Sequence, residues 1–135
     1  MALMLGSTTA WAGPAPALTQ LNIETVESPD CAKENVVQGL GSTRCDHGGG
    51  YLKVTVVEVG LGRHAIATLD GFSVSGTRIA LCRSNQSLVP CSGSGTTAGY
   101  RYTYTLNGKD RGTFSVRNAS INAPSNTLST QIYIR

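Results

Sequence analysis

The sequence is poor in charged and aromatic residues: 14% of its 135 side chains are Asp, Glu, Lys or Arg, and 6% are Phe, Trp or Tyr. It also lacks an uninterrupted run of about 18 apolar residues, which excludes a membrane-spanning helix. The formal net charge is only +3, and Lys and Arg do not gather in one stretch, so we expect no nucleic-acid partner. The motifs G-x-S-x-G, H-E-x-x-H and the phosphate-binding loop are absent, so none of these enzyme classes is indicated.

Turn-forming residues are frequent, and they separate short apolar segments in which polar and apolar residues alternate. This composition is typical of a β-rich extracellular domain. We expect an all-β fold, a single antiparallel β-sandwich of about seven or eight short strands stabilised by disulfides. The clearest strands are predicted at residues 18–26, 51–59, 63–69, 77–83 and 127–135.

The start of the chain is predicted to direct secretion. Residues 1–12 are apolar, then small and polar, and end in Ala10-Trp11-Ala12, a small-x-small cleavage pattern. We interpret them as the remnant of a signal peptide, followed by an extended linker at residues 13–18 and one β-sandwich domain at residues 19–135. The expected location is therefore extracellular.

The four cysteines predict two disulfide bonds, as is usual in an exported chain. Three pairings are possible, and we favour the local one, Cys31–Cys45 with Cys82–Cys91, because it closes two turn-rich loops. A zinc site is the alternative, but no C-x-x-C pair is present and the histidines lack zinc-finger spacing. We therefore expect no metal and no cofactor.

Residues 100–117 predict a β-hairpin with an aromatic face. Tyr100, Tyr102 and Tyr104 alternate with polar residues, and Phe114 follows the Asn-Gly turn signal, so Tyr104 is expected opposite Phe114 or Gly112. The tyrosine row is interpreted as core rather than as a sugar-binding platform. In one register Arg101 faces Arg117, and such a like-charge pair points to an anionic partner.

Two glycine-rich turns flank the strand at residues 51–59, and each contains one of the two histidines. In the first turn, residues 46–50, Asp46 is placed to orient His47, and the glycines could bind an anion through backbone N–H groups. A purely structural turn is the simpler interpretation. A nine-residue strand would separate the histidines by roughly 30 Å, so they should not share a metal or a proton. The candidate binding residues are Asp46, His47, Gly48, Gly49, Arg63, His64, Arg101 and Arg117.

The Asp46-His47-Gly48-Gly49 turn, the glycine turn at residues 60–63 and the ending Gln131-Ile132-Tyr133-Ile134-Arg135 together resemble the YolA-like family. That family consists of small secreted bacterial proteins, some prophage-encoded, with a domain of unknown function. The resemblance implies secretion, a bacterial origin and a role for the first turn beyond chance. It implies no catalytic residues and does not extend to the cysteines.

These observations favour a secreted binding module whose partner is an extracellular protein or a cell-envelope component. Polar, glycine-rich turns on a rigid scaffold are where binding residues usually lie. Two alternatives remain: a small hydrolase that uses Asp46 and His47 as catalytic residues, and a secreted antagonist of competing bacteria. We do not expect an enzyme.

Overall fold

The computed structural model describes residues 16–93, 95–123 and 125–135. Over these residues the regular elements are β-strands, and no helix long and apolar enough to cross a membrane is present. The predicted signal-peptide remnant and the first half of the predicted linker lie outside the described residues. The strands are β1 (Gln20–Ser28), β2 (Ala32–Asn35), β3 (Tyr51–Val59), β4 (Ile66–Leu69), β5 (Phe72–Val74), β6 (Thr77–Ser84), β7 (Ser87–Pro90), β8 (Thr97–Asn107), β9 (Gly112–Ala119) and β10 (Thr127–Ile134).

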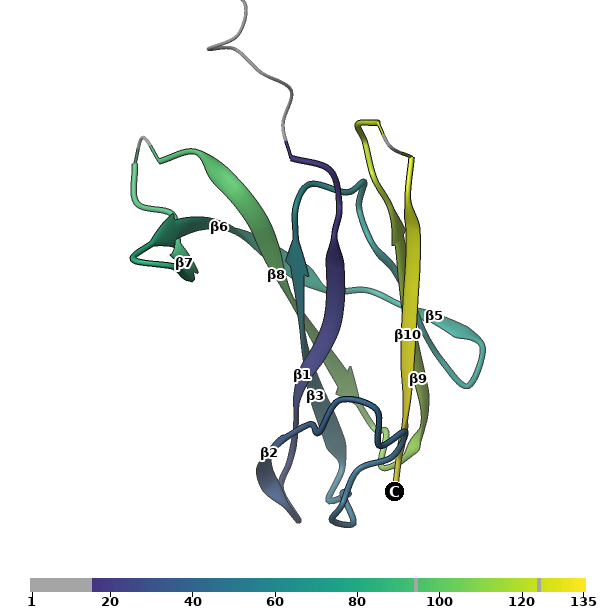
Figure 1. Ribbon diagram of the computed structural model, residues 1–135. Coiled ribbons are helices and arrows are strands. Elements are labelled where there is room, and N and C mark those ends of the chain that lie inside the picture. Colours follow the sequence, from purple (N-terminus) through teal and green to yellow (C-terminus); the bar gives the residue numbers. More distant parts are fainter. Residues whose placement is uncertain (1–15, 94, 124) are drawn as a thin grey trace, which may run out of the picture.

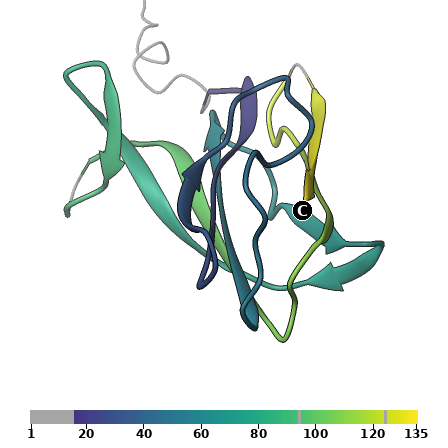
Figure 2. The same cartoon turned by 90° about the horizontal axis from the view of Figure 1, so that it is seen from below.

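The strands form two antiparallel sheets. One sheet has six strands in the order β2-β1-β3-β8-β6-β7, and the other has four in the order β10-β9-β4-β5. Figures 1 and 2 show the four-stranded sheet packed over the β1–β3 part of the larger sheet, while β6 and β7 extend away from it. The expected all-β sandwich is confirmed. The expected number of strands was too low, because β2 and β7 have only four residues each and show no clear alternation of apolar and polar residues.

β3 supplies the centre of the core because its side chains alternate. Leu52, Val54 and Val56 point inward and are fully buried, whereas Lys53 between them is exposed. β3 has the bounds that the sequence predicted, and it pairs with β1 on one side and β8 on the other. Glu58 occupies the next inward position of the same row and is also fully buried. One end of the core is therefore polar, which the alternation alone does not indicate.

The predicted hairpin at residues 100–117 is wrong. β8 pairs with β3 and β6 in the six-stranded sheet, whereas β9 pairs with β4 and β10 in the other sheet. Tyr104 and Phe114 do meet, but they meet across the sandwich, with ring centroids 5.3 Å apart. The connection between β8 and β9 thus passes from one sheet to the other. Arg101 and Arg117 lie in different sheets and are not a cross-strand pair.

Both disulfides have the pairing that the sequence analysis favoured. Cys82–Cys91 joins the end region of β6 to the residue after β7, across a sequence separation of 9. Cys31–Cys45 joins the turn between β1 and β2 to the long loop before β3, across a separation of 14. A loop of this length is stabilised by about 3 kcal/mol in the chain-entropy account. The Cys31–Cys45 bridge therefore fixes the loop that contains the first glycine turn.

Candidate functional site

His47 lies inside the protein, in a loop that closes one end of the sandwich. Its residue is 7% exposed, and the backbone N–H of His47 donates to the carbonyl oxygen of Arg135 at 2.6 Å. On the ring, Nδ1 lies 2.7 Å from Ser28 Oγ, and Nε2 lies 3.0 Å from Glu34 Oε1. Both ring nitrogens therefore have hydrogen-bond partners, one from the end of β1 and one from β2.

Glu34, rather than Asp46, is the carboxylate that orients this imidazole. Glu34 is 7% exposed, and it accepts backbone hydrogen bonds from Arg44 at 2.7 Å and from Cys45 at 3.3 Å. Burial acts to raise the pKa of Glu34, but these N–H groups and His47 outweigh it and hold the pKa below its ordinary value. Asp46 is exposed, and its Oδ1 lies 3.6 Å from Arg135 Nε. The ionised Glu34 is thus a fixed part of the loop.

Ser28, His47 and Glu34 form a hydrogen-bonded chain of the residue types that hydrolases use for nucleophilic catalysis. Ser28 is only 2% exposed, however, and its Oγ also accepts a hydrogen bond from Cys31 N at 3.2 Å. The cavity that reaches His47 is lined by Asp46, His47, Arg111, Tyr133 and Arg135, without Ser28. The hydroxyl that would have to attack a substrate is therefore buried. We infer that these three hydrogen-bonded side chains hold the loop in place.

The glycines of the first turn have conformational reasons to be there. Gly48 and Gly49 have φ angles of +147° and +98°, and a Cβ atom on Gly49 would lie 2.7 Å from Pro29 Cβ. The N–H of Gly50 donates to Asp110 Oδ1 at 3.0 Å. One of the glycine N–H groups that the sequence suggested for an external anion therefore already binds a protein carboxylate.

The second turn, at the other end of β3, is organised by the buried Glu58. Its carboxylate accepts hydrogen bonds from Gly62 N at 2.9 Å and from Asn118 Nδ2 at 2.6 Å, which ties the turn to β9. Burial raises the pKa of Glu58 despite these donors. Asn118 also donates to the carbonyl oxygen of Arg63 at 2.6 Å. The backbone of the turn is therefore rigid, while the side chains of Arg63 and His64 remain exposed.

The exposed end of this turn opens onto the outer face of the four-stranded sheet. Arg63, His64, Ile66 and Arg117 line a hollow of about 170 Å³ together with Asn118, Ala119 and Thr127. Ile66 and Arg117 also line an adjoining groove of about 310 Å³ across β4, β9 and β10. Three of the candidate binding residues from the sequence (Arg63, His64 and Arg117) thus meet on one surface.

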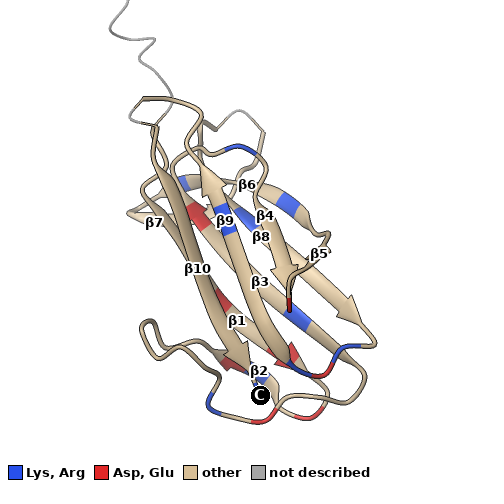
Figure 3. Cartoon of the chain, turned by 90° about the vertical axis from the view of Figure 1, so that its right-hand side faces the viewer, with Lys and Arg blue, Asp and Glu red and all other residues tan. Residues whose placement is uncertain are grey.

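We call this surface the outer face; its members are the outward residues of β4, β9 and β10 and the two exposed residues of the second turn. The cross-strand registers place Ile66, Arg117 and Ser129 in one row and Thr68, Ser115 and Gln131 in the next. The face is lined by hydroxyl and amide groups, and β4, β9 and β10 contain no Asp or Glu. Figure 3 shows one blue band on β9 and none on β10, with the acidic residues elsewhere.

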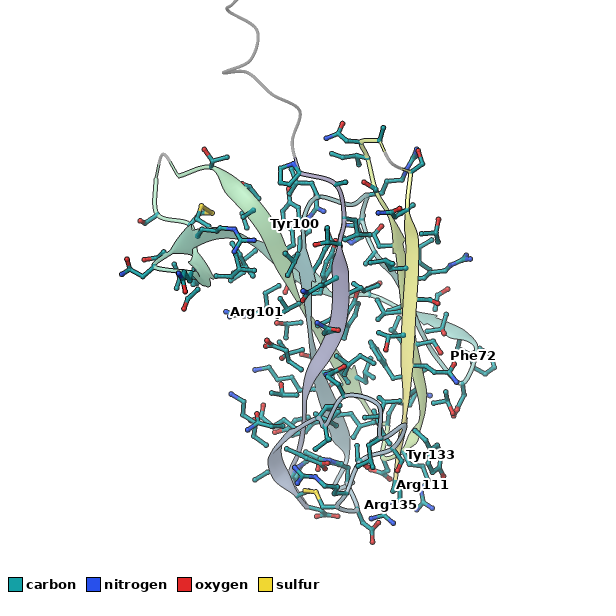
Figure 4. All side chains as sticks on the ribbon, viewed as in Figure 1. Phe72, Tyr100, Arg101, Arg111, Tyr133 and Arg135 are labelled. Atoms are coloured by element: carbon teal, nitrogen blue, oxygen red, sulfur yellow. A yellow bond between two sulfur atoms is a disulfide. The ribbon has the colours of Figure 1, made fainter. Side chains whose placement is uncertain are left out.

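The remaining candidate, Arg101, belongs to a different surface. It lines a hollow on the six-stranded sheet together with residues of β1, β3, β6 and β7. Figure 4 shows Arg101 on the opposite side of the molecule from Tyr133, Arg111 and Arg135, which lie close together at the lower end. The eight candidate binding residues therefore divide among three places: the loop of His47, the outer face, and the hollow of Arg101.

The model of a protein family, described as Domain of unknown function (DUF4879), matches residues 13–134. The chain belongs to the DUF4879 family. Comparisons with curated proteins and with solved structures found no match. The match begins at residue 13, in the predicted linker of this DUF4879 protein. The last residue of that linker, Leu18, is fully buried and donates its N–H to Ser120 Oγ at 3.1 Å, so it packs with the matched domain.

Sequence reasoning missed the buried partners of both turns. Ser28 and Glu34 are separated from His47 by 19 and 13 residues, and Asn118 is 60 residues from Glu58. One signal for Glu58 was available: it occupies an inward position of the alternating strand, where an acid requires hydrogen-bond donors. No comparable pattern marks Glu34, because β2 has only four residues.

Proposed function

We propose that this DUF4879 protein is a secreted binding module that recognises an anionic, hydroxyl-rich polymer of the cell envelope on its outer face. The observation that carries the proposal is the pair Arg63 and Arg117, which line one hollow on a face without carboxylates. None of the ion pairs between described residues involves either arginine. Two unpaired guanidinium groups favour a partner that carries carboxylate or phosphate groups.

The neutral part of the outer face suits the rest of such a polymer. Ser115, Ser129, Thr68 and Gln131 offer both hydrogen-bond donors and acceptors, as sugar hydroxyl groups require. Tyr133 continues the same outward row of β10 and is 46% exposed, so that one ring surface is available for an apolar contact. A linear chain lying along the strands would meet Tyr133 at one end, hydroxyl and amide groups in the middle and arginine at the other end.

Secretion, bacterial origin, prophage association and the YolA-like assignment belong to this proposal. Two disulfides support an oxidising compartment, and the sequence resemblance supports the rest. Binding is proposed in preference to hydrolysis by Asp46 and His47, because the His47 ring is buried and both of its nitrogens have protein partners. No contact among the residues that the structure describes specifically favours an antagonist of other cells.

The test uses three purified polymers as probes: polygalacturonate, which carries carboxylates, a poly(glycerol phosphate), and neutral dextran. We expect binding to one or both polyanions but not to dextran, and weaker binding when NaCl is raised from about 0.05 M to about 0.5 M. The double variant Arg63→Ala/Arg117→Ala should weaken binding about tenfold or more.

Arg101→Ala, on the six-stranded sheet, is the matched control and should bind like the unmodified protein. The comparison of the two polyanions distinguishes carboxylate from phosphate recognition. Binding that is unaffected by the double variant, equal binding of dextran, or no binding to either polyanion would each reject the proposed function.

A further inference from the structure

Four side chains with metal-binding atoms converge at the loop that closes the lower end of the sandwich. They are Cys31, Glu34, Cys45 and His47, and one ligand atom from each lies within 4.8 Å of all the others. Two of them are joined in the disulfide Cys31–Cys45. The side chains of the other two are almost completely inaccessible, with His47 0% and Glu34 6% exposed.

We propose that reduction of Cys31–Cys45 converts this cluster into a four-ligand site for Zn²⁺. A thiol or phosphine reductant would supply two electrons, and two protons would complete the two thiols. Zinc would then displace both protons as the thiolates coordinate, and His47 Nε2 and one oxygen of Glu34 would complete the coordination shell. The disulfide and the metal are thus alternative cross-links for the same loop.

The His47 and Glu34 ligand atoms need only small shifts to reach the positions of a tetrahedral centre. Bonds of about 2.0–2.3 Å to zinc place neighbouring ligand atoms about 3.3–3.8 Å apart. His47 Nε2 lies 3.6 Å from Cys45 Sγ, which is within this range. Glu34 Oε1 lies 3.0 Å from His47 Nε2 and 3.1 Å from Cys45 Sγ, and it would move outward by a few tenths of an ångström when the metal binds. The two sulfur atoms must separate when the bond between them is broken, and a Cα–Cα distance of 6.4 Å leaves room for this movement by side-chain rotation.

The surrounding hydrogen bonds orient the ligands as metal sites require. In the zinc-bound state a proton on Nδ1 would let the His47 ring donate to Ser28 Oγ, 2.7 Å away. Nε2, which donates to Glu34 in the oxidised protein, would then direct its lone pair at the metal. The backbone N–H of Arg44 donates to Glu34 Oε2 at 2.7 Å, which fixes that carboxylate. Two thiolates with one imidazole and one carboxylate favour Zn²⁺ over Mg²⁺ or Ca²⁺, which prefer oxygen ligands.

The second disulfide provides an internal comparison. Reduction of Cys82–Cys91 would also give two thiols. Among the described residues, however, no His, Asp or Glu joins this pair in a cluster of three or more metal-binding side chains. If a reduced cysteine pair were sufficient, both bridges would bind metal after reduction. If the four-ligand cluster is required, only the Cys31–Cys45 site will bind metal after reduction.

The test uses the whole chain reduced with a phosphine, with Co²⁺ as a spectroscopic probe and Zn²⁺ as its competitor. We expect thiolate-to-cobalt charge transfer and a tetrahedral d–d band in the reduced protein, both removed by Zn²⁺, and neither in the oxidised protein. Cys82→Ser/Cys91→Ser should retain these signals and Cys31→Ser/Cys45→Ser should lose them. Glu34→Gln and His47→Gln should each weaken binding about tenfold or more.

Folding is followed in the same samples by circular dichroism and urea unfolding. Zinc should raise the urea midpoint of the reduced protein, because it binds the folded loop more tightly than the unfolded chain. Metal binding that is unchanged in Glu34→Gln and His47→Gln would show that thiolates bind in an unfolded loop, and would overturn the proposal. A reduced chain that gives no cobalt spectrum, or loses its β-structure even with zinc, would overturn it as well.

Discussion

Tyr102 and Tyr104 stack in the core with ring centroids 6.2 Å apart and planes 7° from parallel. Among the described residues, only one of the two hydroxyl groups has a hydrogen-bond partner. Tyr102 Oη accepts from Ala65 N at 3.2 Å and donates to the carbonyl oxygen of Arg63 at 3.3 Å. Tyr104 Oη is buried and has no hydrogen-bond partner among the described residues. Burial raises the pKa of Tyr104, so its hydroxyl stays neutral.

This difference predicts opposite effects of the same chemical change. Tyr104→Phe removes an unsatisfied hydroxyl, so the free energy of unfolding should stay constant or rise by up to about 1 kcal/mol. Tyr102→Phe leaves the buried Ala65 N–H without its partner and should lower the free energy of unfolding by about 1–2 kcal/mol. Urea unfolding of both variants measures the difference. A larger loss for Tyr104→Phe than for Tyr102→Phe would contradict the hydrogen-bond assignment.

Glu58 predicts a pH dependence of stability with a defined sign. Burial raises its pKa above the ordinary value of 4.5, so the folded protein binds the proton more tightly than the unfolded chain. This contribution to stability is fully present below the ordinary pKa and is lost as the pH rises through the folded pKa. Relative to Glu58→Gln, the unmodified protein should therefore become less stable as the pH rises above 4.5.

The measurement is urea unfolding of both proteins over a series of pH values. The difference between the two free energies removes the titration of other groups, including Glu34, whose lowered pKa acts in the opposite direction. A difference that is constant, or that favours the unmodified protein with rising pH, would show that Glu58 does not have a raised pKa.

Alternation within a segment predicted the strands and their inward faces, because it reflects which side of each strand is buried. It could not predict which sheet a strand joins. Tyr104 and Phe114 were expected side by side and do touch, but from opposite sheets, since two inward faces meet equally well across a sandwich. The hairpin pattern therefore identified the contact between Tyr104 and Phe114 correctly but assigned the wrong topology, and Arg101 and Arg117 lie in different sheets.

The candidate residues were predicted less completely because their partners are distant in the sequence. Their adjacency in the sequence suggested that Asp46 orients His47, whereas successive side chains of an extended chain point in opposite directions. Asp46 turns outward to Arg135, and Glu34, brought in by the Cys31–Cys45 bridge, takes the inward place. Arg117 joined Arg63 and His64 only because β9 lies beside β4.

Gly60 and Gly71 form a matched pair with similar backbone conformations, φ +87° and +85°. A Cβ atom on Gly71 would meet nothing within 4 Å, so Gly71→Ala should lower the free energy of unfolding by about 1 kcal/mol from backbone strain alone. A Cβ atom on Gly60 would lie 2.0 Å from Ala17 O, where the chain crosses the end of β3. Gly60→Ala should therefore cost about 3 kcal/mol or more. Similar losses in thermal or urea unfolding would mean that the segment at Ala17 is not packed against this turn.

Glu34 should contribute strongly to the stability of the oxidised protein. Glu34→Ala leaves His47 Nε2 and the backbone N–H groups of Arg44 and Cys45 without their shared acceptor in a buried place. We expect a loss of about 2–4 kcal/mol in the free energy of unfolding. The control is Glu27→Ala, because Glu27 lies on the neighbouring strand and pairs with the partly exposed Lys53 at 3.9 Å. Such surface pairs contribute about 1 kcal/mol or less. Urea unfolding without reductant compares the two, and equal losses would show that the His47 cluster does not hold the loop.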